Sequence, residues 1–247
     1  MIEYIFLGII QGLTEFLPVS SSGHLVILQN LLGVTADKLT VSVVLHLGTL
    51  LAVVIFFRKD ILGLFRNPRM LGLVLVASAI TGIIGISAKD LFERAFCSVR
   101  VVGAAWFFTG LILIFAGKAS SSGRRTPGAK DACFLGLVQS LAIIPGVSRS
   151  GITISALLLR KIDPKEAFTF SFLVSIPLIL AAAALEAGKI NGLNAGDLGN
   201  LTAGFFFSLL TGLAALSFLR MVINKARFHY FGYYCLFVSV LTLIFIR

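Results

Sequence analysis

The feature that most constrains this chain is a polar interruption between two apolar runs near its N-terminus. Residues 11–24 read Gln-Gly-Leu-Thr-Glu-Phe-Leu-Pro-Val-Ser-Ser-Ser-Gly-His, so a carboxylate, several hydroxyls and an imidazole lie within one hydrophobic region. Such groups are costly to bury unless other polar groups satisfy them. The chain must therefore fold so that this stretch meets polar partners or lines a cavity.

A second stretch repeats the first. Residues 136–153 read Gly-Leu-Val-Gln-Ser-Leu-Ala-Ile-Ile-Pro-Gly-Val-Ser-Arg-Ser-Gly-Ile-Thr. Gln11 and Gln139 occupy equivalent positions, 128 residues apart. The second stretch lacks a carboxylate and contains Arg149 instead. One stretch therefore offers an acid and a histidine, and the other offers a guanidinium.

Composition indicates an integral membrane protein. The chain is 57% hydrophobic and 13% charged, whereas a soluble domain carries about 25% charged residues. Its mean hydropathy is +1.00. The net charge of +10 does not indicate nucleic-acid binding, because the basic residues cluster between apolar runs. That pattern is typical of membrane orientation.

Six segments are long and apolar enough to span a membrane, which takes about 17–25 residues. They are Val41–Phe57, Leu71–Ala88, Val101–Gly117, Ala167–Leu185, Leu198–Leu219 and His229–Ile246. The apolar pieces beside the two polar stretches are mostly shorter. Residues 1–34 and 132–159 therefore predict two re-entrant helix-loop-helix hairpins. The alternative for the first is that Met1–Leu17 spans the membrane outright.

These elements predict an all-α membrane fold with six transmembrane helices and two hairpins in an inverted-topology repeat. Residues 1–247 form one membrane domain, in which a first repeat (1–117) and a second (130–247) flank a cytoplasmic linker (118–130). Each repeat is one hairpin followed by three spans, and an odd number of spans inverts the second copy. Of the 21 Lys and Arg residues, fourteen fall on one predicted face and six on the other. The positive-inside rule places the richer face in the cytoplasm.

Four side chains of the first hairpin could carry chemistry. Gln11 and Glu15 are four residues apart and share one helical face. An acid in an apolar hairpin is a functional candidate, although a buried, satisfied carboxyl is the simpler alternative. Ser21 and His24 lie close by in sequence, but serines here could also cap the following helix. His46, inside a predicted span, is interpreted as a satisfied interior histidine.

The second hairpin predicts an anion cradle. Gly146 allows a tight backbone, and Arg149 offers a planar fork that matches phosphate oxygens. Hydroxyl donors surround it at Ser148, Ser150 and Thr153. The alternative is a structural ion pair between Arg149 and Glu15, which a substrate phosphate could still break.

On these two motifs the chain resembles the undecaprenyl-diphosphate phosphatase family, also called the bacitracin-resistance protein family. The resemblance covers essentially the whole chain. It implies hydrolysis of a C55 polyprenyl diphosphate to the carrier monophosphate for peptidoglycan synthesis. It also implies a multi-pass protein of the bacterial inner membrane, with a site open to the extracytoplasmic side, and a divalent cation, usually Mg²⁺ with Ca²⁺ as an alternative.

Carried over to this sequence, the resemblance assigns catalytic roles to Glu15, Ser21, His24 and Arg149. It assigns substrate binding to a second set that includes Arg149: Ser22, Gly146, Ser148, Ser150 and Thr153. Many family members have glutamate where this chain has Gln11, so the metal would depend on Glu15, and direct ligation by Gln11 is doubtful.

Three nucleophiles are open at this point. Ser21 is the first choice, with Glu15 as base or metal ligand and His24 as acid–base partner. A phosphorylated His24 is the second, and direct attack by water the third. A transporter or flippase for a lipid phosphate or small anion is the alternative function, because inverted repeats with broken helices are typical of transporters. Glycine-rich spans are compatible both with a homodimer and with packing inside one chain.

Overall fold

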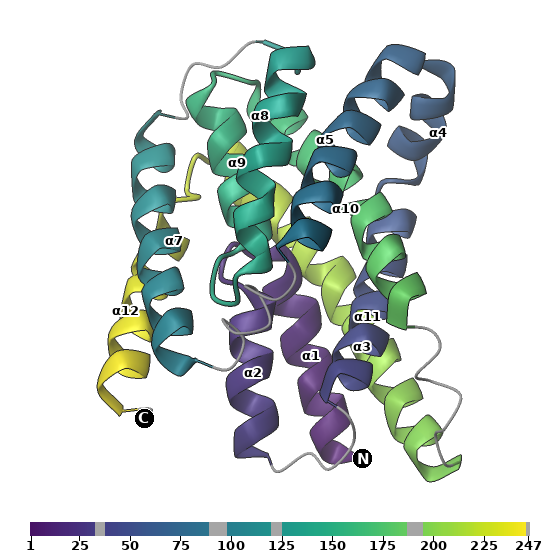
Figure 1. Cartoon of the computed structure of the whole chain (residues 1–247), viewed down its shortest axis with the longest axis vertical. Helices are drawn as coiled ribbons and strands as arrows, with labels where there is room; N and C mark the ends of the chain where they lie inside the picture. The colour runs from purple at the N-terminus through teal and green to yellow at the C-terminus, as the bar shows by residue number, and fades with distance from the viewer. Residues whose placement is uncertain (33–37, 89–97, 120–124, 187–194, 246–247) are drawn as a thin grey trace.

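The computed structural model describes residues 1–32, 38–88, 98–119, 125–186 and 195–245. Within these ranges the regular structure is helical, apart from an isolated bridge between Arg125 and Ile162. The helices, shown in Figure 1, are α1 (Ile2–Phe16), α2 (Ser21–Leu31), α3 (Lys38–Phe56), α4 (Arg58–Arg66), α5 (Pro68–Ser87), α7 (Val99–Ala119), α8 (Ala129–Ser140), a short 3₁₀ turn η1 (Leu141–Ile143), α9 (Arg149–Leu159), α10 (Pro164–Glu186), α11 (Ala195–Asn224) and α12 (Tyr230–Phe245).

Each of the six predicted spans is a helix, but they differ in length. Among the described residues, four helices are long and apolar enough to cross a membrane, namely α5, α7, α10 and α11. A fifth candidate is α3 together with α4, which bends by 69° after Phe56. The sixth, α12, has 16 residues and is therefore about 24 Å long, which is short for a hydrocarbon core of about 30 Å. The confirmed part of the predicted fold is an all-helical chain with four to five spanning candidates.

Two helix pairs meet at non-helical tips in the middle of the molecule. In Figure 1, α1 and α2 fill the lower half, α8 and α9 fill the upper half, and their tips face each other. Each tip contains a proline, and the residue before a proline is biased away from helix. Leu17 and Ile144, which precede Pro18 and Pro145, both have extended backbone. The proline positions thus explain why each helix stops there.

Glycines bring the helices around the first tip close together. Helix α1 packs on α11, where an ideal Cβ on Gly8 would lie 3.0 Å from the carbonyl carbon of Gly204. Helices α7 and α12 meet in the same way, since a Cβ on Gly110 would lie 2.8 Å from the Gly232 carbonyl oxygen. Small residues let helix backbones approach in membrane proteins. Glycines thus allow α1 to approach α11, and α7 to approach α12, at close backbone distance.

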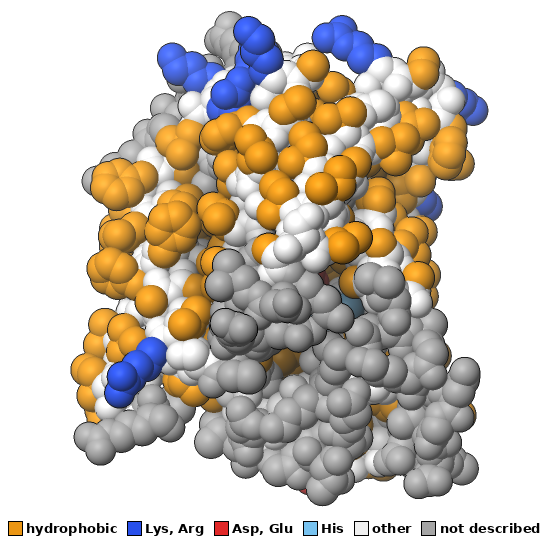
Figure 2. All heavy atoms as spheres, viewed as in Figure 1, with side chains coloured by type: hydrophobic (Ala, Val, Ile, Leu, Met, Phe, Trp, Pro, Cys, Tyr) orange, Lys and Arg blue, Asp and Glu red, His pale blue; other side chains and the backbone are white. Residues whose placement is uncertain are grey.

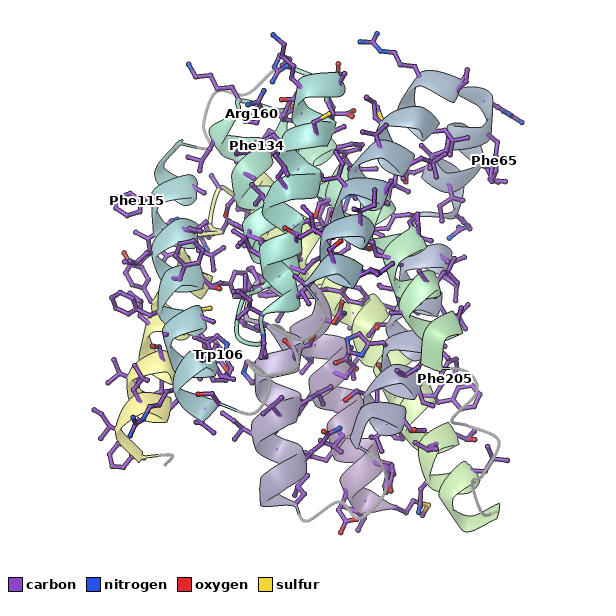
Figure 3. The ribbon with its side chains drawn as sticks, in the orientation of Figure 1. Phe65, Trp106, Phe115, Phe134, Arg160 and Phe205 are labelled. Atoms are coloured by element: carbon purple, nitrogen blue, oxygen red, sulfur yellow. The ribbon has the colours of Figure 1, made fainter. Side chains whose placement is uncertain are left out.

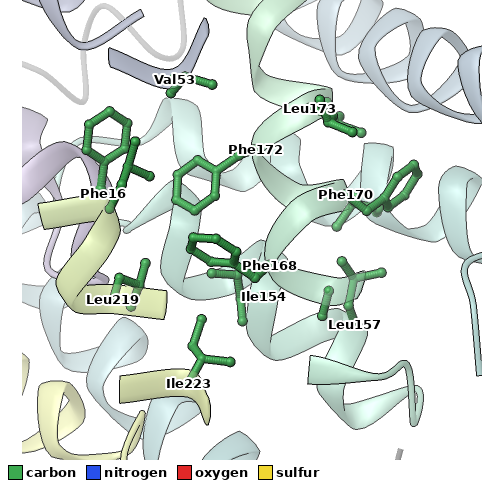
Figure 4. Close-up of a cluster of buried hydrophobic side chains, with 14 of the residues drawn as sticks. Phe16, Val53, Ile154, Leu157, Phe168, Phe170, Phe172, Leu173, Leu219 and Ile223 are labelled. Atoms are coloured by element: carbon green, nitrogen blue, oxygen red, sulfur yellow. The ribbon is translucent and has the colours of Figure 1, made fainter. Parts of the chain in front are cut away.

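An aromatic cluster fills the interior beside the tips. Phe16 and Phe172 have ring centroids 5.5 Å apart, and Phe168 lies 5.1 Å from Phe172. Figure 4 shows these rings packed between α1 and α10 with aliphatic side chains around them. Phe57 extends the cluster toward α4, at 5.3 Å from Phe168.

The outer surface is apolar along its sides and basic at one end. Phe65 and Phe115 are 74% and 65% exposed, and Figure 3 shows both pointing outward. Figure 2 shows hydrophobic side chains over the flanks and most visible Lys and Arg side chains at the end that carries α4 and the start of α8. An apolar belt with charge beyond it is what a bilayer requires. The predicted linker 118–130 falls partly outside the described residues.

Candidate active site

The tips of the two helix pairs are joined by hydrogen bonds between serine hydroxyls and the backbone. Ser20 has a left-handed backbone (φ 66°), and its Oγ accepts from the amide of Gly146 at 3.2 Å. Gly146 itself has φ 96°, a conformation that glycine adopts without steric cost. The start of α2 is thereby fixed beside the start of α9.

Helix α7 supports both tips from one side. The indole Nε1 of Trp106 donates to the carbonyl oxygen of Val19 at 2.7 Å. One turn further, the Thr109 hydroxyl donates to the Gly146 carbonyl at 3.2 Å and accepts from the amide of Ser148 at 3.2 Å. Two side chains of α7 thus satisfy backbone groups that the breaks leave without helical partners.

Glu15 is the carboxylate at the centre of the site. It is 9% exposed, and its Oε1 accepts from Arg149 Nη2 at 2.5 Å. Its Oε2 accepts from Ser21 Oγ at 2.5 Å and from Gln11 Nε2 at 3.2 Å. A buried charge of this kind is tolerated when it is paired and hydrogen-bonded on all sides. The ion pair that was the alternative to the anion cradle is therefore present, since Arg149 reaches Glu15 from the opposite tip. The cradle itself stays a prediction.

Two buried polar atoms beside this pair lack partners among the described residues. They are Nη1 of Arg149 and Oε1 of Gln11. Unpaired buried groups are rare and costly, and they point to a ligand or water. The guanidinium also lies over the Phe172 ring, with Cζ 5.6 Å from its centroid. The site therefore holds a free donor on a fixed cation, which suits an anionic ligand.

His24 lies next to the tips but turns away from Glu15. Its Nδ1 donates to the Ser20 carbonyl at 2.6 Å, and its Nε2 is 2.7 Å from the Tyr234 hydroxyl. Its ring packs edge-on against Trp106 at 5.1 Å. The side chain thus faces α7 and α12, and its catalytic role stays a prediction.

The hydroxyls of the second tip are engaged in the fold. Ser148 caps α9 by accepting from the amide of Gly151 at 3.1 Å. Ser150 donates to the Leu17 carbonyl at 3.3 Å, across the two tips. Thr153 Oγ1 lies 2.6 Å from the Ser171 hydroxyl and donates to the Arg149 carbonyl. Ser22, on the first tip, lies 3.2 Å from the Ser20 hydroxyl. Their predicted contacts with substrate stay predictions.

Sequence reasoning missed His46 as a member of the site. Its Nε2 lies 3.3 Å from Oε2 of Glu15, although it belongs to α3 and is 31 positions away in sequence. The only signal in the sequence was a titratable side chain inside an apolar span, which by default is a functional candidate. The helical pattern does not reveal which neighbour such a side chain faces.

The residues at the site fit a divalent cation only if the ligand supplies most of the coordination. Within the described ranges, no three or more His, Cys, Asp or Glu side chains are grouped so that they could hold a metal ion. Glu15 is the carboxylate available, and the unpartnered Oε1 of Gln11 is a second oxygen. This set suits Mg²⁺, which keeps waters and uses substrate phosphates as ligands.

Comparison with known proteins gives consistent matches. The family model described as bacitracin resistance protein BacA matches residues 4–241. The undecaprenyl-diphosphatase of Carboxydothermus hydrogenoformans is 40% identical over 250 residues, covering 98% of this chain and 96% of the relative. The protein of that name from Halothermothrix orenii matches at 40% with the same coverage. That from Thermotoga maritima is 39% identical over 96% of this chain and 98% of its own length.

Proposed function

This chain belongs to the bacitracin resistance protein BacA family, and we propose that it hydrolyses undecaprenyl diphosphate to undecaprenyl phosphate and inorganic phosphate. This reaction recycles the lipid carrier for cell-wall synthesis. It also confers bacitracin resistance, because the drug sequesters the diphosphate form. The observation that carries the proposal is the Glu15–Arg149 pair across the two tips, with Ser21 at 2.5 Å from the same carboxylate.

The diphosphate binds at Arg149. A phosphate oxygen takes the free Nη1 and replaces Glu15 at Nη2, which gives a bidentate contact. The N-terminal ends of α2 and α9 meet at the same place, and helix N-termini favour anions. Ser22, Gly146, Ser148, Ser150 and Thr153 shape this cradle. The prenyl tail leaves between helices into the lipid.

Ser21 is the nucleophile. Its Oγ forms a bond to the terminal phosphorus while the anhydride P–O bond breaks, and undecaprenyl phosphate leaves with the bonding electrons. Glu15 accepts the Ser21 proton through the contact that already exists. Glu15 releases this proton to water. A water molecule then forms a bond to the phosphorus of the phosphoserine while the P–Oγ bond breaks. One proton of this water returns to Oγ through Glu15, and inorganic phosphate leaves. Arg149 stabilises the charge that develops on the transferred group.

A divalent cation, Mg²⁺, completes the site. Glu15 would hold it together with water and substrate oxygens. Contrary to the expectation from the sequence, we add Oε1 of Gln11 to this set, because it is buried and has no partner among the described residues. When bound, it neutralises phosphate charge in the transition state.

The membrane arrangement that we infer has six spans and two re-entrant hairpins. Residues 1–117 and 130–247 are inverted repeats, the linker 118–130 is cytoplasmic, and the site opens to the extracytoplasmic side of the inner membrane. Two features support this arrangement. The helix pairs reach the middle of the molecule from opposite ends, and most visible Lys and Arg gather at one end. The aromatic cluster also lies between the site and the basic end. Two of its members, Phe57 and Phe168, line a hollow together with the basic residues Lys165 and Arg220.

The test is phosphate release by the detergent-purified protein from a prenyl diphosphate, with and without a chelator. We expect release that the chelator abolishes and added Mg²⁺ restores. Ser21→Ala should lose nearly all turnover, while Ser217→Ala, whose hydroxyl bonds to its own helix α11, should not. A transporter would release no phosphate, because detergent solution has no compartments. Trapped phosphate on a residue other than Ser21 would refute the nucleophile assigned here.

A further inference from the structure

His46 connects the proposed site to a helix outside both hairpins. Its Nε2 lies 3.3 Å from Oε2 of Glu15, and its Nδ1 lies 2.6 Å from the Ser42 carbonyl oxygen. Nδ1 faces a carbonyl oxygen, which can only accept, so Nδ1 carries a hydrogen. Nε2 faces the carboxylate of Glu15. The imidazole is thus anchored to the backbone of α3 on one side and holds Glu15 on the other.

We propose that His46 is a positioning residue of the active site, which fixes the Glu15 carboxylate from α3 so that Oε2 stays aligned with Ser21. This inference rests on the proposed function. It gives His46, which would otherwise be interpreted as an interior packing residue, a specific role in the reaction.

The other contacts of Glu15 explain why a fixed donor is needed. Arg149 turns to the phosphate when substrate binds, and the Ser21 hydroxyl loses its proton during attack. Gln11 stays, but it belongs to the same helix as Glu15 and moves with it. Among the described contacts of this carboxylate, His46 is therefore the one from outside the hairpins. Small displacements of a catalytic group cost large factors in rate.

His46 is more accessible than the carboxylate that it contacts. About a third of its side chain, 30%, remains accessible, compared with 7% for Glu15. A histidine that served as core filler would be enclosed, as Phe172 is at 0%. His46 instead borders the site with one ring nitrogen committed to the backbone.

Two amide variants separate positioning from packing. Glutamine places its Nε2 at about the reach of the histidine Nε2, so His46→Gln keeps a donor for Glu15. Asparagine ends near the position of Nδ1, so His46→Asn can bond to Ser42 but cannot reach Glu15. His229→Gln, at a histidine whose ring packs against Tyr230 on α12, is the control for loss of an imidazole elsewhere.

We expect His46→Asn to lower kcat by about 10–100-fold, with KM within a factor of about three. His46→Gln should recover most of the loss, and His229→Gln should match wild type. A purely structural role predicts that Gln and Asn lower stability and activity alike. Equal rates for the Gln and Asn variants, or an unchanged kcat in His46→Asn, would overturn the proposal.

A double-mutant cycle measured by thermal unfolding tests the contact between His46 and Glu15 independently of catalytic turnover. Glu15→Ala and His46→Asn should shift the unfolding midpoint non-additively, because either change removes the same His46–Glu15 contact. Additive shifts would contradict the contact. A wild-type protein that releases no phosphate would refute the proposed function, whereas an active wild type with an equally active His46→Asn would refute only the role of His46.

Discussion

At the residue scale, the site is organised by one carboxylate that four side chains contact. Glu15 meets Arg149 on one oxygen and Ser21, Gln11 and His46 on the other. Removing a partner from a buried charge is costly, because the charge that remains is uncompensated. The proposed chemistry uses the same arrangement, since one of the two nearest donors, at 2.5 Å, is the Ser21 hydroxyl, which the carboxylate would deprotonate.

Arg149→Lys tests whether the planar donor arrangement of the guanidinium contributes to hydrolysis beyond its positive charge. Lysine keeps the positive charge but loses the planar pair of donors, including the free Nη1. We expect kcat/KM to fall by about 100-fold or more, the usual cost of one lost transition-state donor. Steady-state hydrolysis measures it, with Arg220→Lys at the basic end as the matched control. Comparable rates for both variants would show that charge alone suffices.

Single residues were predictable to different degrees. Glu15, Ser21 and Arg149 were identifiable in the sequence, because polar groups in apolar runs are costly to bury without a partner. The structure brings all three together. The orientation of His24 toward Tyr234 was not predictable, because it depends on where α12 packs. His46 was missed for the same reason, since its neighbour lies on α1.

At the scale of elements, glycine contacts set how closely α1 approaches α11. The Cβ of Gly8→Ala would meet backbone of Gly204, which cannot yield as a flexible side chain does. We expect a lower unfolding midpoint in detergent, corresponding to about 1–3 kcal/mol of overpacking. Gly72→Ala on α5, where a Cβ would meet nothing within 4 Å, should not lower the midpoint and should raise it slightly, because Ala is the better helix former. Equal unfolding midpoints for wild type and Gly8→Ala would mean that α1 can move away from α11 without a loss of stability.

A second element-scale contact ties the basic end together. Asp131, at the start of α8 and outside the spanning helices, accepts from Arg125 at 2.7 Å and Arg160 at 2.5 Å. Burial alone would raise the pKa of Asp131, but hydrogen bonds from Arg125, Arg160 and the Gly128 amide hold it below its ordinary value of 3.8. Figure 3 shows Arg160 at this end, near Phe134.

Asp131→Asn should therefore destabilise the protein at neutral pH. A depressed folded-state pKa contributes stability that is present above the ordinary pKa and is lost as pH falls through the folded one. The midpoint difference between wild type and variant should be full at pH 7 and shrink below about pH 4. Thermal scans across pH measure it, with exposed Asp60→Asn as control. A difference that grows in acid would contradict this sign.

Elements were largely predictable, because hydrophobic runs and prolines define them. The six long apolar segments are helices, and both breaks fall at Pro18 and Pro145. Lengths were less certain, as α12 is 16 residues long where a full span was expected. The bend of 69° after α3 depends on how α4 lies at the basic end, which no local pattern encodes.

At the scale of the whole molecule, two halves that each lack a complete site form one by meeting at their tips. The first supplies the acid and the hydroxyl, and the second supplies the guanidinium. Ser20, Gly146 and Ser150 join the tips by hydrogen bonds. The repeat in the sequence predicted this division, whereas the supporting contacts from α7 follow only from the three-dimensional packing.

The most direct test of this account is a kinetic cycle on Glu15→Gln and Arg149→Lys, measured as kcat/KM for prenyl diphosphate hydrolysis. If both residues act as one unit on the diphosphate, the double variant should lose about as much as the worse single variant. A double variant whose loss in kcat/KM equals the product of the two single losses would contradict a shared site. Single variants that keep near-wild-type rates would also contradict it.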